Sequence, residues 1–250
     1  MYLLLFVAGI FAGFVNTVAG AGSALTVPAF MLTGLDAAAA NASNRVAVVV
    51  QTVAGSAAFH RRGVRPWAEC RPVLPILLLG SVLGALCATR LSPASMQSAF
   101  GGLFVVLAAL LGFKPRWLNP PPQGVGDAAL PNVRGLPTQG LFLAAGFYGG
   151  FIQAGVGIPL LLLLVRRLGL DVVRGNAAKT ALTMTFTIAA LIVFQNEGRV
   201  NWPCGLATAC GSLIGSLIGV EAAVRLGAEL IRRAVIVGLL LAAARTFGWI

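Results

Sequence analysis

The chain has 250 residues, of which 58% are hydrophobic and only 10% are charged, and its mean hydropathy is +0.90. Ordinary water-soluble domains of this size are far more polar, so the composition predicts a membrane protein. A formal charge of +11 would favour nucleic-acid binding in a soluble protein, but here the basic residues lie between apolar runs. We therefore expect them to orient helices in a membrane, and we expect no nucleic-acid partner.

In chain order, the apolar runs predict helical segments separated by Arg, Pro and Asn. They do not alternate every second residue as the strands of a membrane barrel do, so the predicted fold class is all-α, a polytopic membrane helical bundle. Five segments precede a proline-rich stretch: 3–18, 23–34, 42–60, 73–90 and 96–113. Five follow it: 138–154, 158–168, 176–195, 203–222 and 230–250. This gives a first membrane repeat over 1–113, a cytoplasmic linker over 114–137 and a second membrane repeat over 138–250.

The first two segments of each half are separated by a break that the chain repeats. Residues 13–28 read GFVNTVAGAGSALTVP, and residues 150–159 read GFIQAGVGIP. A break in a membrane helix frees backbone groups, so it survives only where protein or a wet cavity supplies partners for them. Two such breaks at matching positions are the best sequence pointer to a transporter's binding site. Gly22 and Gly157 are expected to need a positive φ or a close backbone approach.

The similarity of the two halves extends well beyond the breaks. A shift of 135 positions pairs Gly34-Leu35-Asp36 with Gly169-Leu170-Asp171, Asn41-Ala42 with Asn176-Ala177, Phe59 with Phe194, Gly63 with Gly198, Trp67 with Trp202 and Gly80-Ser81 with Gly215-Ser216. Chance does not keep one offset over that length, so the sequence indicates an internal duplication. Glycine pairs with GxxxG spacing recur across the repeat and predict close helix packing: Gly9/Gly13, Gly146/Gly150, Gly80/Gly84 and Gly211/Gly215/Gly219.

An odd number of segments in each half predicts that the second half is inverted relative to the first. If the loop 60–71 is cytoplasmic, alternation also places the linker and the loops 166–179 and 221–233 inside, and these hold most of the basic residues. The positive-inside rule favours this arrangement. We expect a multi-pass protein of the cell inner (plasma) membrane with both termini outside the cytoplasm, and whether the short segments 23–34 and 158–168 cross or re-enter stays open. The basic residues left outside are Arg45, Arg90, Arg199 and Arg245.

In an inverted pair the two breaks enter from opposite sides, so their tips should meet near the middle of the membrane. Buried amides there need partners from protein, water or substrate, although they could also serve only the backbone freed at the glycines. The helices that start at Ser23 and Ile158 should point N-terminal amides into the same cavity, which favours an anion. The residues predicted to bind it at the breaks are Asn16, Thr17, Gly20, Gly22, Ser23, Gln153, Gly155 and Gly157.

A second polar cluster begins the third segment of each half. Lys179 lies a turn inside an apolar helix, where it either extends to the cytoplasmic headgroups or binds substrate, and the sequence favours neither. Several cations would hold an anion too tightly, so Arg45 and Lys179 are not expected to lie in the site together. From this cluster, the candidate substrate-binding residues are Asn41, Asn44, Asn176 and Lys179, with Ser43 and Thr180 beside them.

The acidic residues fall at segment ends or in loops, so no carboxylate is placed to relay protons or sodium ions through the membrane. The four cysteines form no CxxC pair. The sequence also has no catalytic constellation, Walker motif or metal-ligand spacing. We therefore expect neither an enzyme nor a cofactor or metal site.

Two halves that each open with a Gly-Phe helix, a Gly-x-Gly break with a nearby proline, a Gly-Leu-Asp turn and a helix that begins Asn-Ala resemble the TauE/SafE sulfite-exporter family of membrane permeases. The resemblance covers nearly the whole chain. It implies transport of a small sulfur-containing anion, such as sulfite, sulfoacetate, thiosulfate or another organosulfonate, outward across the bacterial inner membrane. It also implies that Gly20, Gly22, Gly155 and Gly157 are family positions. The chain departs from the usual pattern at Ser23, where a third glycine often follows, and at Ile158.

The expected function is thus export of such an anion by a secondary transporter. An importer or a channel-like anion facilitator of the same fold stays open, and so does a membrane accessory subunit that transports nothing. The accessory subunit would need no polar residues at matched breaks. The expected partners are the small anion and membrane lipid, and a homodimer stays open.

The inverted topology predicts the side from which two loops are reached. Single cysteines at Gly63 and Gly198, placed in a cysteine-free background, should react with an impermeant thiol reagent from opposite sides of the membrane. Labelling of both from the same side would contradict the inversion.

Overall fold

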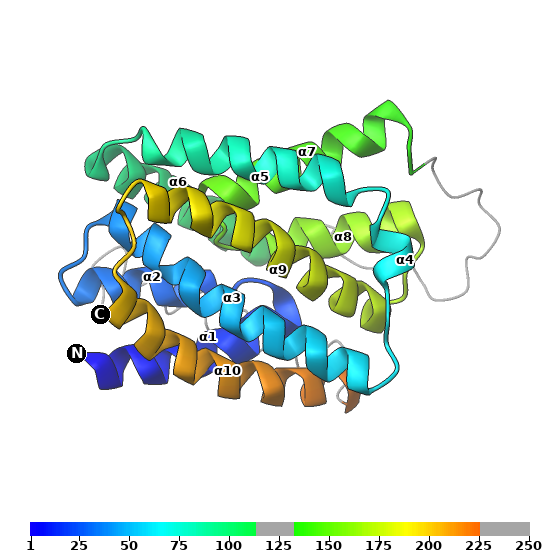
Figure 1. Cartoon of the computed structure of the whole chain (residues 1–250), viewed down its shortest axis with the longest axis horizontal. Helices are drawn as coiled ribbons and strands as arrows, with labels where there is room; N and C mark the ends of the chain where they lie inside the picture. The colour runs from blue at the N-terminus through cyan, green and yellow to red at the C-terminus, as the bar shows by residue number, and fades with distance from the viewer. Residues whose placement is uncertain (114–132, 226–250) are drawn as a thin grey trace.

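The computed structural model describes residues 1–113 and 133–225, and every regular element in these ranges is a helix (Figure 1). Each predicted segment within them coincides with a helix, and only the four-residue α4 was not predicted. The predicted segment 230–250 and most of the linker 114–137 lie outside the described residues. The helices are α1 (Tyr2–Ala19), α2 (Ser23–Leu32), α3 (Ala37–Arg61), α4 (Trp67–Cys70), α5 (Leu74–Thr89), α6 (Pro93–Phe113), α7 (Leu136–Phe151), α8 (Gly157–Leu168), α9 (Val172–Asn196) and α10 (Trp202–Arg225).

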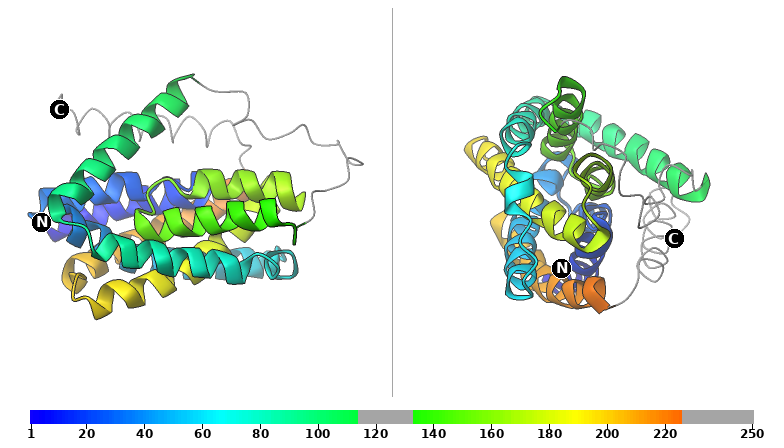
Figure 2. Two further views of the ribbon diagram at one scale, coloured as in Figure 1. Left: turned by 90° about the horizontal axis from the view of Figure 1, so that it is seen from above. Right: turned by 90° about the vertical axis from the view of Figure 1, so that its right-hand side faces the viewer.

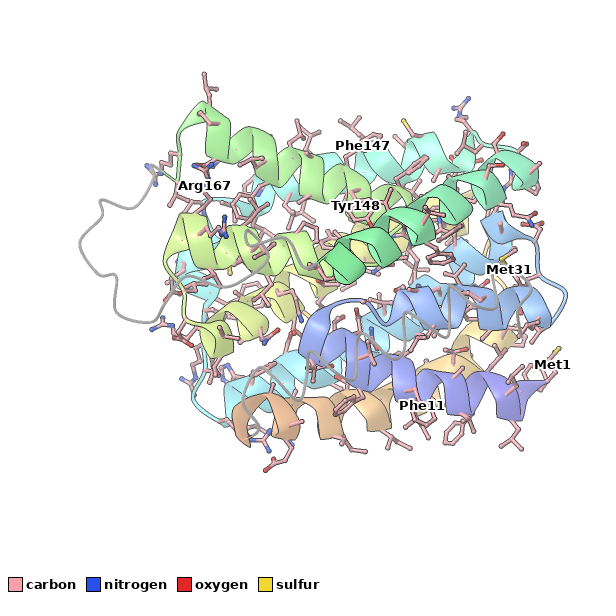
Figure 3. All side chains as sticks on the ribbon, turned by 180° about the vertical axis from the view of Figure 1, so that it is seen from behind. Met1, Phe11, Met31, Phe147, Tyr148 and Arg167 are labelled. Atoms are coloured by element: carbon pink, nitrogen blue, oxygen red, sulfur yellow. The ribbon has the colours of Figure 1, made fainter. Side chains whose placement is uncertain are left out.

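Each half begins with a broken helix that turns back on itself. α1 runs inward from Met1, the chain breaks after Ala19, and α2 returns, so Met1 and Met31 lie at the same end of the bundle (Figure 3). α7 and α8 do the same from the opposite end, where α8 finishes beside Arg167 (Figure 3). Each short helix therefore turns back toward the end of the bundle from which the preceding helix came, as a re-entrant segment does.

Corresponding helices of the two halves run in opposite directions. In Figure 1, α1, α3 and α10 run from left to right, whereas α7, α9 and α5 run from right to left. α6 is tilted away from the long axis that the other long helices share (Figure 2). The inversion of the two halves across a membrane stays a prediction, which the labelling experiment above tests.

The backbone repeats at the same spacing as the sequence. The glycines with positive φ in the described residues form three pairs 135 positions apart: Gly20 and Gly155, Gly34 and Gly169, and Gly63 and Gly198. Asp36 and Asp171 have the same separation and cap the N-termini of α3 and α9, where their carboxylates accept hydrogen bonds from backbone N–H groups. Duplicated turn and cap residues have therefore produced duplicated helix ends.

The two halves exchange packing partners. α1 of the first half packs along α10 of the second, and α7 of the second packs along α5 of the first. At both crossings a Cβ atom on the glycine would overlap the facing backbone: it would lie 2.2 Å from Ser212 O at Gly13 and 2.2 Å from Leu77 O at Gly146. Small residues allow this close approach, which is needed because lipid gives apolar helices no hydrophobic reason to associate.

The exposed side chains of the bundle include many large apolar ones. Phe11 is 65% exposed and Ile192 is 57% exposed, and Phe11 projects from the outer edge of the bundle in Figure 3. Among the described residues, two helical stretches, Val172–Asn196 and Trp202–Ala223, are long and apolar enough to cross a membrane. An apolar outer surface around long helices suits contact with lipid.

The basic loops gather at one end of the bundle. The connection from α3 to α5 and the turn from α8 to α9 lie at the same end (Figure 1). Ion pairs between described residues at this end, Arg62 with Glu221 and Arg174 with Glu69, each join one half to the other. This end is the one that the sequence predicts to be cytoplasmic.

We expect Gly146→Ala to destabilise the folded protein by about 1–3 kcal/mol, because the added methyl group overlaps the α5 backbone and forces α5 and α7 apart. Gly140→Ala in the same helix is the matched control, since a Cβ at Gly140 meets no atom within 4 Å. Thermal melting of both purified variants in detergent measures the difference. Equal melting temperatures would show that the crossing does not need its glycine.

Candidate functional site

The two helix breaks meet inside the bundle, as the sequence predicts. The backbone N–H of Gly157 donates a 3.1 Å hydrogen bond to the carbonyl oxygen of Gly20. A Cβ on Gly20 would lie 2.3 Å from Gly157 Cα, and a Cβ on Gly157 would lie 2.2 Å from Gly20 Cα. Both positions therefore need glycine, and the halves of the protein are joined backbone to backbone at this point.

Both α1 and α7 end in a tight turn beside this contact. Gly20 ends α1 with a φ of 77°, and in the second half Gly155 has a φ of 77° and Gln153 a φ of 67°. Gly22 and Gly157 were predicted to need either a positive φ or a close backbone approach, and the close approach is the reason in both cases. A Cβ on Gly22 would lie 2.1 Å from Ala12 O. A residue other than glycine at positive φ is strained, and such strain gathers at functional positions. Gln153 is the one such residue in the described ranges.

A small polar cavity lies beside the contact between the breaks. The space open to the centre of a water molecule is about 10 Å³, which is room for about one water. The structure is therefore closed around the site, and an oxyanion would need it to widen. The cavity is lined by residues from both breaks and from α3 and α9: Asn16, Thr17, Gly20, Thr52, Gln153, Val156, Gly157, Lys179, Thr180 and Thr183.

Lys179 brings a positive charge to this cavity. Its side chain is only 2% exposed. Its Nζ donates hydrogen bonds to Thr17 O at 2.9 Å, to Asn16 O at 3.2 Å and to Asn176 Oδ1 at 2.8 Å. The two carbonyls belong to the last turn of α1, at the negative end of its helix dipole. Lys179 thus holds the end of α1 onto α9, and the alternative that it extends to the lipid headgroups is wrong.

Other polar groups of the cavity are not committed to protein partners. Asn16 and Thr183 make no side-chain hydrogen bond in the part of the chain that the structure describes. Gln153 is 2% exposed; its Nε2 donates to Thr187 Oγ1 at 2.7 Å, while its Oε1 has no partner. A half-turn of this amide would let Thr187 donate to the oxygen and would free the two amide hydrogens. Neutral donors are therefore available next to the cation.

Arg45 holds α7 in the way that Lys179 holds α1. Its guanidinium donates to Gly149 O at 2.8 Å and to Gly150 O at 2.7 Å, and it lies 4.8 Å from the centre of the Phe194 ring. Arg45 is fully buried, so its predicted place among the basic residues outside the membrane is wrong. Counting Lys179 with the loop 166–179 is wrong for the same reason. Both cations lie deep in the bundle, but only Lys179 lines the cavity.

Comparison with known proteins identifies the family. The sequence matches the family described as sulfite exporter TauE/SafE over residues 5–246. The chain belongs to this family. No solved structure matches it.

Three curated relatives of this TauE/SafE protein cover almost all of it. The "Probable membrane transporter protein ORF9" of Sinorhizobium sp is 29% identical over 231 residues, which is 91% of this chain and 85% of the relative. A "Probable membrane transporter protein" of Haemophilus influenzae is 26% identical over 236 residues, or 94% and 89% of the two chains. The "Probable membrane transporter protein YfcA" of Escherichia coli K12 is 27% identical over 237 residues, or 94% and 85%. These names describe a membrane transporter, which is not an enzymatic role.

The candidate residues of this TauE/SafE protein divide into those that line the cavity and those that support it. Asn176 bonds Lys179, Asn41 donates from Nδ2 to Phe151 O at 2.8 Å, and Asn44 accepts a hydrogen bond from Thr26. The supporting group also includes Gly22, Ser23 and Gly155, which shape the breaks. The predicted residues that line the cavity are Asn16, Thr17, Gly20, Gln153, Gly157 and Lys179.

Sequence reasoning missed two threonines of the cavity wall, Thr52 and Thr183. Thr180, Thr183 and Thr187 follow Asn176 at helical spacing, so they form one polar face on an otherwise apolar α9. Thr52 of α3 stands 135 positions before Thr187 and is a threonine too. The helical spacing of the polar residues on α9 could have identified Thr183, and the 135-residue offset between the halves could have identified Thr52. Val156, also missed, carries no polar signal.

Several amides at the starts of α2 and α8 already have acceptors. Gly157 N–H bonds Gly20 O, Ile158 N–H bonds Gly155 O, and Ala24 N–H bonds Ala21 O. At α8 the prediction that the helix start offers free amides to an anion is therefore wrong in the closed state, because the tight turns at the breaks supply carbonyls. At α2 it stays a prediction for the amide of Ser23. No carboxylate lines the cavity among the described residues.

Gly157→Ala is expected to stop transport, because its Cβ would lie 2.2 Å from Gly20 Cα and would push the two breaks apart. Gly102→Ala is the control, since a Cβ there meets nothing within 4 Å. Membrane insertion and sulfite flux into proteoliposomes are measured for both. Full flux in Gly157→Ala would mean that the contact between the breaks is dispensable.

Proposed function

We propose that this protein exports a small sulfur-containing anion, such as sulfite, sulfoacetate, thiosulfate or another organosulfonate, across the bacterial inner membrane. The observation that carries the proposal is the buried Lys179 at a polar cavity between two touching helix breaks. Membership of the TauE/SafE family supports the substrate class. The site would bind the anion between the two halves, where alternating access from either side is possible.

The groups around the cavity suit a small oxyanion with several acceptor oxygens. Lys179 supplies one positive charge, while Asn16, Thr183 and the amide of Gln153 supply neutral hydrogen bonds. A hydrogen bond to a charged group is worth about 1.5–3 kcal/mol, so one cation with neutral donors binds an anion without trapping it. A transport site has to release its cargo, and this composition allows release.

Electrostatics favour outward movement. No carboxylate lines the cavity among the described residues, so nothing there repels an anion or carries a coupling proton. A cell interior about 100 mV negative drives each negative charge outward by about 2.3 kcal/mol. Export of an anion therefore needs no coupling ion. The arginine-rich end of the bundle, on the proposed cytoplasmic side, would attract anions from the cytoplasm.

Replacing both amides of the breaks tests the site. Asn16→Leu combined with Gln153→Leu should abolish binding and flux, because it removes neutral donors from both sides of the cavity and leaves Lys179 alone with the anion. The matched control is Gln195→Leu, which changes an exposed amide at the end of α9.

Flux of sulfite, sulfoacetate and thiosulfate is measured in proteoliposomes, with a thermal melt to confirm that each variant is folded. If the double variant is folded and transports these anions as well as the parent, the site lies elsewhere and the matched breaks are architectural.

A further inference from the structure

We propose that Lys179 can bind the transported anion only by releasing the end of α1, so that anion binding and the opening of the first break are one event. The inference rests on the proposed function, because it assigns to one residue of that site the coupling between binding and movement. It concerns α1 and leaves α7 in place.

The first observation is that Lys179 has no spare donor. An ammonium group has three N–H bonds, and those of Lys179 meet Thr17 O, Asn16 O and Asn176 Oδ1. The cavity beside it has room for about one water. An incoming oxyanion can therefore reach an N–H of Lys179 only if a carbonyl of α1 gives it up and the wall moves back.

The second observation is what the exchange would replace. The two α1 carbonyls are neutral acceptors, whereas an oxyanion carries a full charge and makes stronger hydrogen bonds with a cation. In the absence of an anion, release would leave a buried ammonium with too few partners, which is costly. The exchange is thus favourable with an anion and unfavourable without one, so the empty site stays shut.

The third observation is that the second break is held differently. Arg45 uses two N–H groups on Gly149 O and Gly150 O, and Asn41 adds a bond to Phe151 O. Arg45 does not line the cavity, so an anion there does not reach it. α7 therefore keeps its partners when the anion binds, and α1 moves against it by breaking the hydrogen bond between Gly157 and Gly20.

Two buried alanines report on this movement. Ala21 lies in the first break and is 1% exposed, and Ala154 lies in the second and is 0% exposed; neither lines the cavity. In a background without Cys70, Cys87, Cys204 and Cys210, Ala21→Cys and Ala154→Cys are made separately, and each is labelled with N-ethylmaleimide. Methanesulfonate is the anion probe, and its binding is measured independently by a thermal shift.

Methanesulfonate should raise the labelling rate of Ala21→Cys by about tenfold or more, the factor that one hydrogen bond to a charged group represents, and should leave Ala154→Cys unchanged. Lys179→Met should raise the rate of Ala21→Cys without any anion and remove the response to methanesulfonate. Thr185→Val is the matched control, since Thr185 lies on the same helix outside the cavity lining and its hydroxyl donates to Leu182 O of that helix, so the variant should keep the slow basal rate.

Three outcomes overturn the proposal. The first is basal labelling of Ala21→Cys in folded Lys179→Met that equals the parent rate, because Lys179 then does not hold α1 shut. The second is that methanesulfonate binds but slows the labelling of Ala21→Cys or leaves it unchanged, because the anion then enters without replacing an α1 carbonyl at Lys179. This arm needs no change at Lys179 and applies even if Lys179→Met does not fold. The third is equal acceleration at both alanines.

If methanesulfonate neither binds nor is transported, the proposed function fails for organosulfonates. Fast labelling in Lys179→Met would then still support the hold of Lys179 on α1, so the two failures are distinguishable. If Lys179→Met also does not fold in that case, Lys179→Gln replaces it, and parent-like labelling there overturns the proposal.

Discussion

A helix that ends inside a membrane leaves carbonyl groups that lipid cannot satisfy, and the rest of this structure depends on how they are bonded. Each half supplies the hydrogen-bond donors for the carbonyl groups of the other half. Lys179 of the second half bonds the last turn of α1 in the first half, and Arg45 of the first half bonds the end of α7 in the second. Each broken helix is therefore completed by a cation that the other half supplies. The exchanged packing of α1 on α10 and of α7 on α5 accompanies these bonds between the halves.

The two cations differ in a way that fits different roles. Arginine presents a flat fork of donors, and Arg45 uses it to hold two neighbouring carbonyls while its face lies over Phe194. Lysine is a compact charge on a flexible stem, and Lys179 reaches its acceptors at the edge of the cavity. A duplicated architecture has thus become asymmetric at its centre. The arginine side is suited to remain fixed, and the lysine side is suited to exchange one acceptor for another.

The sequence predicted most of the fold because the relevant signals are local or repeated. Apolar runs marked the helices, the glycines at 135-residue spacing marked the turns, and Asp36 and Asp171 marked the starts of α3 and α9. α4 was missed because a four-residue helix in a polar loop has no periodicity to detect. Whether α2 and α8 re-enter depends on the direction in which the chain leaves each break, and composition does not encode that direction.

The candidate site was predicted in part for a related reason. The matched breaks predicted that the two break tips meet, and Gly20 and Gly157 do touch, with Asn16 and Gln153 lining one cavity beside them. The binding partners of the two cations could not be predicted from the sequence. A lysine or arginine near a helix end has the same local pattern whether it faces lipid headgroups or a buried carbonyl. Arg45 and Lys179 find partners more than a hundred residues away, and only tertiary packing decides that.

The central claim is that an anion binds between the two breaks, at Lys179. The most direct test is a structure of the purified protein with 2-bromoethanesulfonate, an organosulfonate whose bromine can be located by its anomalous scattering. The account predicts one bromine position between the α1 and α7 breaks, with the sulfonate oxygens within hydrogen-bond distance of Lys179 Nζ and α1 moved away from it. A fully occupied bromine position elsewhere in the protein, with Lys179 still bonded to Asn16 O and Thr17 O, would contradict it.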